Sequence, residues 1–146
     1  MGRIFLAVAL TVAAFTANAE IVATCGISEG RSYYIPGGLV TGKHAGWTDE
    51  KISKGSFQLI RSGDEYDIVF TDSTGRTLSS KGDGATTSGY RDDAGNLVVT
   101  VMYPGSLIET WVFWLSVKTE RIATYSQARH NAPIRKHSLL KATCNW

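Results

Sequence analysis

From residue 56 onward, the chain alternates between short hydrophobic runs and clusters of turn residues such as Gly, Asp, Ser and Pro. The runs are rich in Val, Ile, Thr, Tyr, Phe and Trp, whose side chains fit a pleated, half-buried surface. Each run therefore predicts a β-strand, and with two apolar stretches nearer the start there are nine candidate segments for a fold of about eight strands. The predicted strands cover residues 21–27, 31–35, 57–61, 66–71, 76–80, 97–103, 107–116, 121–126 and 134–143.

The runs at 57–61 and 66–71 show the alternation of strands with one buried face. Gln58 and Asp67 fall on the opposite face from the hydrophobic side chains, which are Phe57, Leu59, Tyr66, Ile68 and Phe70. No window of adequate length has the spacing of an amphipathic helix. Because the links between strands are short, we expect an antiparallel meander. The prediction is an all-β fold, either a small up-and-down barrel or a barrel-like sandwich, with a two-sheet sandwich as the close alternative.

The first 19 residues have the pattern of an export signal. Arg3 provides a basic start, residues 4–15 carry no charge, and Ala17-Asn18-Ala19 fits a small-x-small cleavage site. This apolar run is too short to anchor a protein in a bilayer. We therefore expect cleavage after Ala19, no transmembrane anchor afterwards, and a single β domain over residues 20–146 in the periplasm or outside the cell.

Two cysteines bracket this domain. Cys25 lies just after its start and Cys144 just before its end. In an oxidising compartment two thiols are expected to pair, so we predict a disulfide that joins the first and last strands. Such a bridge would suit a sheet that closes on itself. Lipidation of Cys25 after Val22-Ala23-Thr24 is the alternative.

Charge gives little guidance to partners. The chain has 15 Lys and Arg against 13 Asp and Glu, and loss of Arg3 with the signal would bring the net charge from +2 to about +1. Near-neutral charge does not predict a nucleic-acid partner. One basic group lies near the end, and it is either a solvated face or a contact for an anionic ligand, polymer or membrane: Arg129, His130, Arg135, Lys136 and His137.

Residues 26–55 contain seven glycines, which predict a long loop with pieces too short for long strands. Tyr33, Tyr34 and Trp47 lie in this segment, with His44 beside them. Aromatic side chains at the mouth of a barrel are suited to clamp an apolar or sugar-like ligand. The alternative is that they plug the open end of the core.

Glu109 is the single charge in the apolar run 107–115, where alternation places it on one face with Trp111 and Phe113. A carboxylate among aromatic side chains is costly unless it is paired. We expect either a ligand contact or a general acid inside the barrel, or a rim residue paired with Arg76 or Arg121. The run is apolar on both faces, so its second face is either covered by loops or meets a partner through Trp111 or Trp114.

Recognisable catalytic and metal motifs are missing from the sequence. The segments 72–75 and 92–96 resemble acidic site motifs but have the composition of hairpin turns. The three histidines lack metal-ligand spacing, and cysteines in a disulfide cannot serve as ligands. We therefore expect no cofactor and no metal, and we consider an enzyme less favoured than a binding protein.

Three function classes follow. The favoured one is a non-catalytic exported domain that binds a small molecule or an envelope component. The alternative is a protein-interaction module, either an inhibitor or an accessory subunit, and the third class is a hydrolase that uses carboxylates. The candidate ligand-binding residues are Tyr33, Tyr34, Trp47, Glu109 and Trp111.

Overall fold

The computed structural model describes residues 18–146, so most of the expected export signal lies outside the described residues. Residues 18–146 form ten β-strands and one short 3-10 helix, η1 (Gly42–His44), with no α-helix. The all-β prediction is confirmed. The strands are β1 (Glu20–Tyr34), β2 (Gly46–Ile52), β3 (Ser56–Ser62), β4 (Glu65–Thr71), β5 (Thr77–Ser79), β6 (Thr86–Arg91), β7 (Leu97–Tyr103), β8 (Leu107–Phe113), β9 (Ile122–Arg129) and β10 (Lys136–Asn145).

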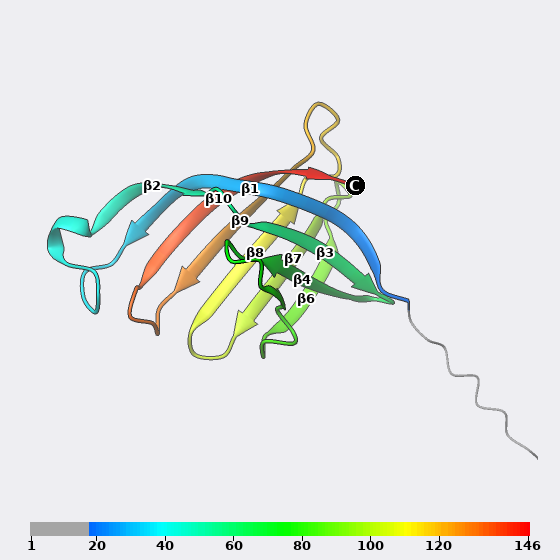
Figure 1. Cartoon of the computed structure of the whole chain (residues 1–146). Helices are drawn as coiled ribbons and strands as arrows, with labels where there is room; N and C mark the ends of the chain where they lie inside the picture. Colours follow the sequence, from blue (N-terminus) through cyan, green and yellow to red (C-terminus); the bar gives the residue numbers. More distant parts are fainter. Residues whose placement is uncertain (1–17) are drawn as a thin grey trace, which may run out of the picture.

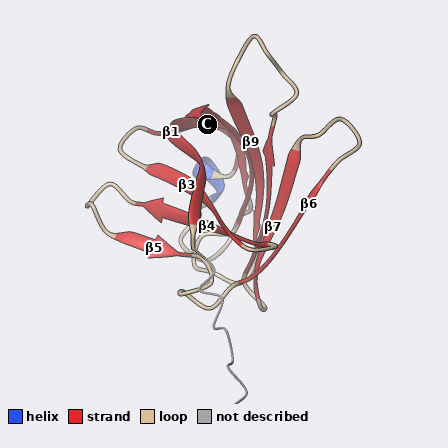
Figure 2. Cartoon of the chain, turned by 90° about the vertical axis from the view of Figure 1, so that its right-hand side faces the viewer, coloured by secondary structure: helices blue, strands red, loops and turns tan. Residues whose placement is uncertain are grey.

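All ten strands belong to one antiparallel sheet. Nine of them have the order β5-β4-β3-β1-β10-β9-β8-β7-β6, and β2 pairs with the second half of β1, beyond the part that pairs with β3. The sheet curls into a half-barrel that is open between β5 and β6 (Figure 2). On the open side, the Thr87 hydroxyl of β6 donates a hydrogen bond to the Tyr66 carbonyl of β4 (2.5 Å). The antiparallel sheet is thus a half-barrel in which the first and last strands are paired, and it is not a two-sheet sandwich.

The predicted disulfide is present. β1 and β10 lie side by side (Figure 1), and Cys25 and Cys144 occupy opposite positions of their ladder. Both sulfurs are buried in the core. Because the Cys25 thiol is bonded to Cys144, the lipidation alternative is not supported.

The expectation of a long loop over residues 26–55 was wrong for most of the segment, because β1 and β2 occupy all but residues 35–45 and 53–55. β1 runs unbroken for 15 residues to Tyr34, with β10 on one edge and both β3 and β2 on the other. At position 30 of this strand only a glycine fits, because a Cβ there would overlap the carbonyl oxygen of Leu139 in β10. The glycine therefore permits close pairing and does not break the strand.

The inner face of the half-barrel holds the core, and it occupies one end of the structure. The disulfide, Leu97 and Phe113 are buried there. Among the inward positions that alternation predicted, Phe57, Leu59 and Ile68 are buried, whereas Tyr66 and Phe70 are partly buried against the core. The buried hydrophobic residues of this core are Ala23, Cys25, Phe57, Leu59, Ile68, Ala85, Leu97, Val99, Val101, Trp111, Phe113, Ala123, Tyr125, Leu140, Ala142 and Cys144.

Two hairpins share one turn geometry, as the sequence predicted. The Asp72 side chain accepts hydrogen bonds from the backbone of Thr74 and Arg76, and Asp92 does the same for Ala94 and Asn96. The fourth residue of each turn is a glycine with positive φ, 86° and 84° respectively. Both segments are therefore turns that connect strands, β4 to β5 and β6 to β7.

Candidate functional site

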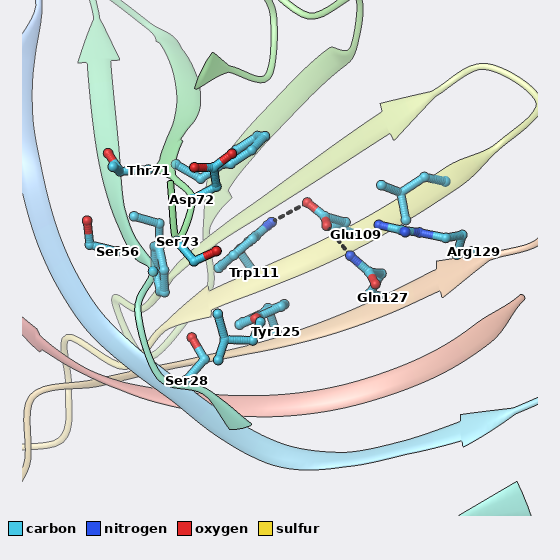
Figure 3. Close-up of a pocket in the computed structure, with 15 residues that line it drawn as sticks. Ser28, Ser56, Thr71, Asp72, Ser73, Glu109, Trp111, Tyr125, Gln127 and Arg129 are labelled. Atoms are coloured by element: carbon cyan, nitrogen blue, oxygen red, sulfur yellow. Dashed lines mark hydrogen bonds between the residues drawn. The ribbon is translucent and has the colours of Figure 1, made fainter. Parts of the chain in front are cut away.

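The interior of the half-barrel contains a cavity of about 360 Å³. Figure 3 shows its lining, which comes from the starts of β3 and β8, the ends of β4 and β9, and the middle of β1. The turn after β4 also reaches its wall. The lining residues are Ser28, Ile52, Gly55, Ser56, Phe57, Phe70, Thr71, Asp72, Ser73, Leu107, Glu109, Trp111, Tyr125, Gln127 and Arg129.

Aromatic side chains form the boundary between the core and the cavity. Trp111 stacks on Tyr125 with ring centroids 3.9 Å apart and an interplanar angle of 17°. Phe57 lies 4.5 Å from Trp111 in a tilted arrangement. Burial raises the pKa of the Tyr125 hydroxyl to about 12, so it is neutral at ordinary pH. The cavity therefore has a rigid, uncharged floor.

Glu109 stands next to this floor and points into the cavity. Its carboxylate accepts one hydrogen bond from Gln127 Nε2 (2.7 Å) and one from Trp111 Nε1 (3.2 Å) (Figure 3). Burial raises its pKa above the ordinary 4.5, against these hydrogen bonds and the positive charge of Arg129. The expected pairing with Arg76 or Arg121 was wrong, because β8 and β9 place Glu109 directly opposite Gln127.

Arg129 lies one step further toward the mouth. It follows Gln127 on the same face of β9, and its half-buried guanidinium points toward Glu109 (Figure 3). Within residues 18–146 this guanidinium makes no hydrogen bond and no ion pair. A positive charge is thus present on the cavity wall without a hydrogen-bonded partner, although it lies near enough to favour the ionised forms of Glu109 and Glu50.

A second polar group continues across β10, β1 and β2. Glu50 forms an ion pair with Lys136 and accepts a hydrogen bond from the Ser32 hydroxyl, while the Ser32 and Ser138 hydroxyls bond to each other (2.6 Å). Burial opposes the ionisation of Glu50, but these bonds and the Lys136 charge outweigh it and hold its pKa below 4.5. Lys136 Nζ also lies 5.5 Å from the centre of the Tyr34 ring. This group is internally satisfied.

The structure separates the five candidate ligand residues. Glu109 and Trp111 line the cavity, and Tyr34 lies with the Glu50–Lys136 pair. Tyr33 and Trp47 contact each other edge-on at 5.5 Å, but they are 41% and 62% exposed on the outer face of β1 and β2. The sequence pattern had placed Tyr33 and Trp47 in a loop at the mouth of a barrel, and the structure does not.

The structure separates the two tryptophans of the apolar run and also the members of the basic group near the end. Trp111 is 5% exposed and faces inward, whereas the Trp114 indole donates to Thr124 Oγ1 (2.9 Å), so the two do not share a partner-facing surface. The basic group near the end is divided, because Arg129 lines the cavity, Lys136 pairs with Glu50, and Arg135 donates to the Pro36 carbonyl (2.6 Å).

Sequence reasoning missed Gln127, Arg129, Phe57 and Phe70 as cavity residues. The missing signal was strand pairing, since Arg129 and Gln127 face Leu107 and Glu109 across the β8–β9 hairpin. Assigning the cross-strand partners of β8 and β9 from the sequence would have placed Gln127 and Arg129 on the inner face with Glu109.

The described chain offers no group of three or more His, Cys, Asp or Glu side chains arranged to hold a metal ion. The helical structure within residues 18–146 does not reach the length and hydrophobicity needed to cross a membrane.

The fold and the cavity together define a single-sheet antiparallel half-barrel with an internal site. Comparison of the chain with protein-family models, curated proteins and solved structures finds no match.

Proposed function

We propose that this protein is an exported, non-catalytic β domain that binds a small molecule or an envelope component in the cavity of its half-barrel. The observation that carries the proposal is the change of lining along the interior, from a filled apolar core to an open, aromatic-floored cavity with convergent polar groups. Ligand sites typically have this composition, with volumes of roughly 300–1,000 Å³. A cavity of about 360 Å³ lies within that range.

Binding suits the polar groups of the cavity better than catalysis does. Glu109 is held by two neutral donors, Gln127 and Trp111, and neither of them is a base or a nucleophile. A hydrolytic site needs a reactive group with an orienting partner that can exchange a proton. Glu109 is instead held in place by two donors that do not exchange a proton with it.

The disulfide supports the export part of the proposal. Bridges such as Cys25–Cys144 persist mainly in oxidising compartments. β1 begins at Glu20, so cleavage after Ala19 leaves every described strand intact.

Native mass spectrometry of the mature chain, recovered from its own export compartment, tests the proposal. We expect a mass excess that is lost on denaturation. Ser73→Trp should remove it, because Ser73 is an exposed turn residue on the cavity wall and a large side chain there covers the mouth. Asp93→Trp is the matched control, since it places the same side chain at the equivalent position of the other hairpin, outside the cavity lining.

A wild-type chain without excess mass would contradict a tightly held ligand. An excess that survives Ser73→Trp would show that the copurified molecule sits elsewhere.

A protein-interaction module is the second candidate, and the outer face of β1, β2 and β10 favours it. Tyr33, Trp47 and Leu139 are exposed there, with the Arg31 guanidinium 5.5 Å from the centre of the Trp47 ring. Aromatic and Arg side chains are enriched at interfaces. If this function holds, a protein that copurifies with the wild type will be lost in Trp47→Ala and retained in Ser73→Trp.

A further inference from the structure

We propose that the ligand of this cavity is an amphipathic carboxylic acid, with a flat apolar body of about two rings and one carboxylate bound by Arg129. This inference rests on the proposed function and names the ligand class for the same site. It follows from three features: the size of the apolar part of the cavity, the free guanidinium, and the occupied oxygens of Glu109.

The apolar part of the cavity sets the size and shape of the body. Phe57, Phe70 and Trp111 contribute aromatic surface, and Ile52 and Leu107 add aliphatic walls. An apolar cavity of roughly 150 Å³ holds benzene. A cavity of about 360 Å³ therefore has room for about two fused rings and a small polar group. Flat rings suit it because aromatic side chains pair with them edge-on or offset.

Arg129 supplies the charge that the ligand must match. Six cations of the described chain form ion pairs, among them Arg31 with Asp49 (3.1 Å), Arg61 with Glu20 (2.8 Å) and Lys136 with Glu50. The Arg129 guanidinium has none in that part of the chain, although it is half-buried. A guanidinium has a planar fork of donors that matches a carboxylate through two parallel hydrogen bonds.

Glu109, the acidic side chain beside Arg129, is poorly placed to bind a cationic ligand. Both of its oxygens already accept hydrogen bonds from the protein. At the turn after β4, Asp72 Oδ1 accepts from the backbone and side chain of Thr74 and the backbone of Arg76. Next to Glu109, the charged group with unused hydrogen-bonding capacity is therefore the Arg129 guanidinium.

Glu109 also limits how much negative charge the ligand carries. A phosphate monoester brings a charge of roughly −1.5 to −2 at neutral pH, and repulsion from a neighbouring carboxylate increases with that charge. Burial raises the pKa of Glu109, which lowers the cost of placing one further anion beside it. A single carboxylate fits these charges better than a phosphate does.

Three probes with the same ring system separate the possibilities: 2-naphthoate, the neutral 2-naphthamide and the cationic 2-naphthylmethylammonium. Their affinities for the wild type and for Arg129→Gln are measured by isothermal titration calorimetry. We expect the wild type to bind 2-naphthoate roughly tenfold or more tightly than 2-naphthamide, as hydrogen bonds to charged groups imply. The ammonium probe should bind most weakly.

Arg129→Gln should weaken 2-naphthoate by the same factor and leave 2-naphthamide unchanged. Arg121→Gln is the matched control, because Arg121 donates to the Trp146 carbonyl outside the cavity, and it should change neither affinity. Thermal unfolding of both variants checks that the fold is retained.

Equal binding of the acid and the amide would overturn the carboxylate inference and leave the binding function standing. Tightest binding of the ammonium probe would overturn it in favour of Glu109 as the recognising charge. Failure of all three probes to bind would overturn the inference of a two-ring carboxylate ligand, whereas the native mass spectrometry above decides separately whether the cavity holds a ligand.

Discussion

Glu109 and Glu50 point into the same half-barrel, but their neighbours act on them in opposite directions. Glu109 has two neutral donors and is buried against aromatic rings, so its pKa is raised. Glu50 faces Lys136 and the Ser32 hydroxyl, and its pKa is lowered in spite of its burial. The difference lies in the charge of one partner, because burial alone disfavours both carboxylates.

Glu109→Gln should change how the stability of the protein depends on pH. The folded state binds the Glu109 proton more tightly than the unfolded state does, so the associated stability is fully present below pH 4.5 and is lost as pH rises through the folded pKa. The free energy of unfolding of Glu109→Gln, relative to wild type, should therefore increase from about pH 4.5 toward neutral pH. Urea unfolding across this range measures it.

Glu50→Gln provides the control of opposite sign. The pKa of Glu50 is lowered, so its contribution is present above pH 4.5 and is lost as pH falls through the folded pKa. The destabilisation by Glu50→Gln should therefore shrink as pH falls. Parallel pH profiles for the two variants would contradict the opposite environments of these carboxylates.

Removing one member of the Glu50–Lys136 pair should cost more than removing both charges. The two side chains are 17% and 13% exposed, so Lys136→Met leaves a carboxylate with little access to water. We expect a loss of about 1–3 kcal/mol in the free energy of unfolding, of which the double variant with Glu50→Gln regains a large part. Urea unfolding of the double-mutant cycle gives the coupling, and simple additivity would contradict it.

At the scale of the element, β1 organises the sheet, because it pairs with β10 on one edge and with β2 and β3 on the other. Gly30→Ala should destabilise the protein by about 1–3 kcal/mol, since the added methyl group meets the Leu139 backbone. Gly26→Ala is the control within the same strand, because nothing lies within 4 Å of its Cβ position. Chemical unfolding compares the two, and equal effects would contradict the close approach of β1 and β10.

Strand positions were predictable where alternation is local. The inward placement of Phe57, Leu59 and Ile68 follows from a period of two, and so does that of Glu109 with Trp111. The full length of β1 was not predictable from the sequence. A glycine looks the same in a strand pattern whether it ends the strand or allows a neighbouring backbone to approach closely. The partner strand decides between these, and for Gly30 that partner lies more than a hundred residues away in β10.

The site was predictable only in part for the same reason. Glu109 and Trp111 belong to one strand, and their shared face can be inferred from their spacing. The sequence gives no comparable signal for Arg129, because there it appears as one member of a basic group whose residues the fold separates. Pairing of β9 with β8 brings it to Glu109.

At the scale of the molecule, the Cys25–Cys144 disulfide joins the first and last strands across a separation of 119 residues. Constraining a loop of that length destabilises the unfolded chain by roughly 4–5 kcal/mol on the chain-entropy model. Cys25→Ala/Cys144→Ala should lose stability of that order in chemical unfolding. Addition of a reductant to the unfolding wild type is the matched comparison, and insensitivity to both would contradict a stabilising bridge.

The half-barrel as a whole divides its interior by polarity. Side chains on the inner face change along β8 from Phe113 to Trp111 to Glu109, and along β9 from Tyr125 to Gln127 to Arg129. Packed hydrophobic side chains and the disulfide fill the apolar part of the interior, whereas the cavity lies where the lining becomes polar. This division is the basis for placing ligand binding inside the sheet and not on its outer aromatic face.

The indole N–H resonances of the four tryptophans test that placement most directly, in ¹⁵N NMR spectra recorded during titration with 2-naphthoate. Trp111 donates its indole N–H to Glu109 inside the cavity, whereas Trp47 is exposed on the outer face. If the ligand binds inside the half-barrel, the Trp111 signal shifts progressively while the Trp47 signal stays in place. A shift of Trp47 without one of Trp111 would contradict binding inside the half-barrel.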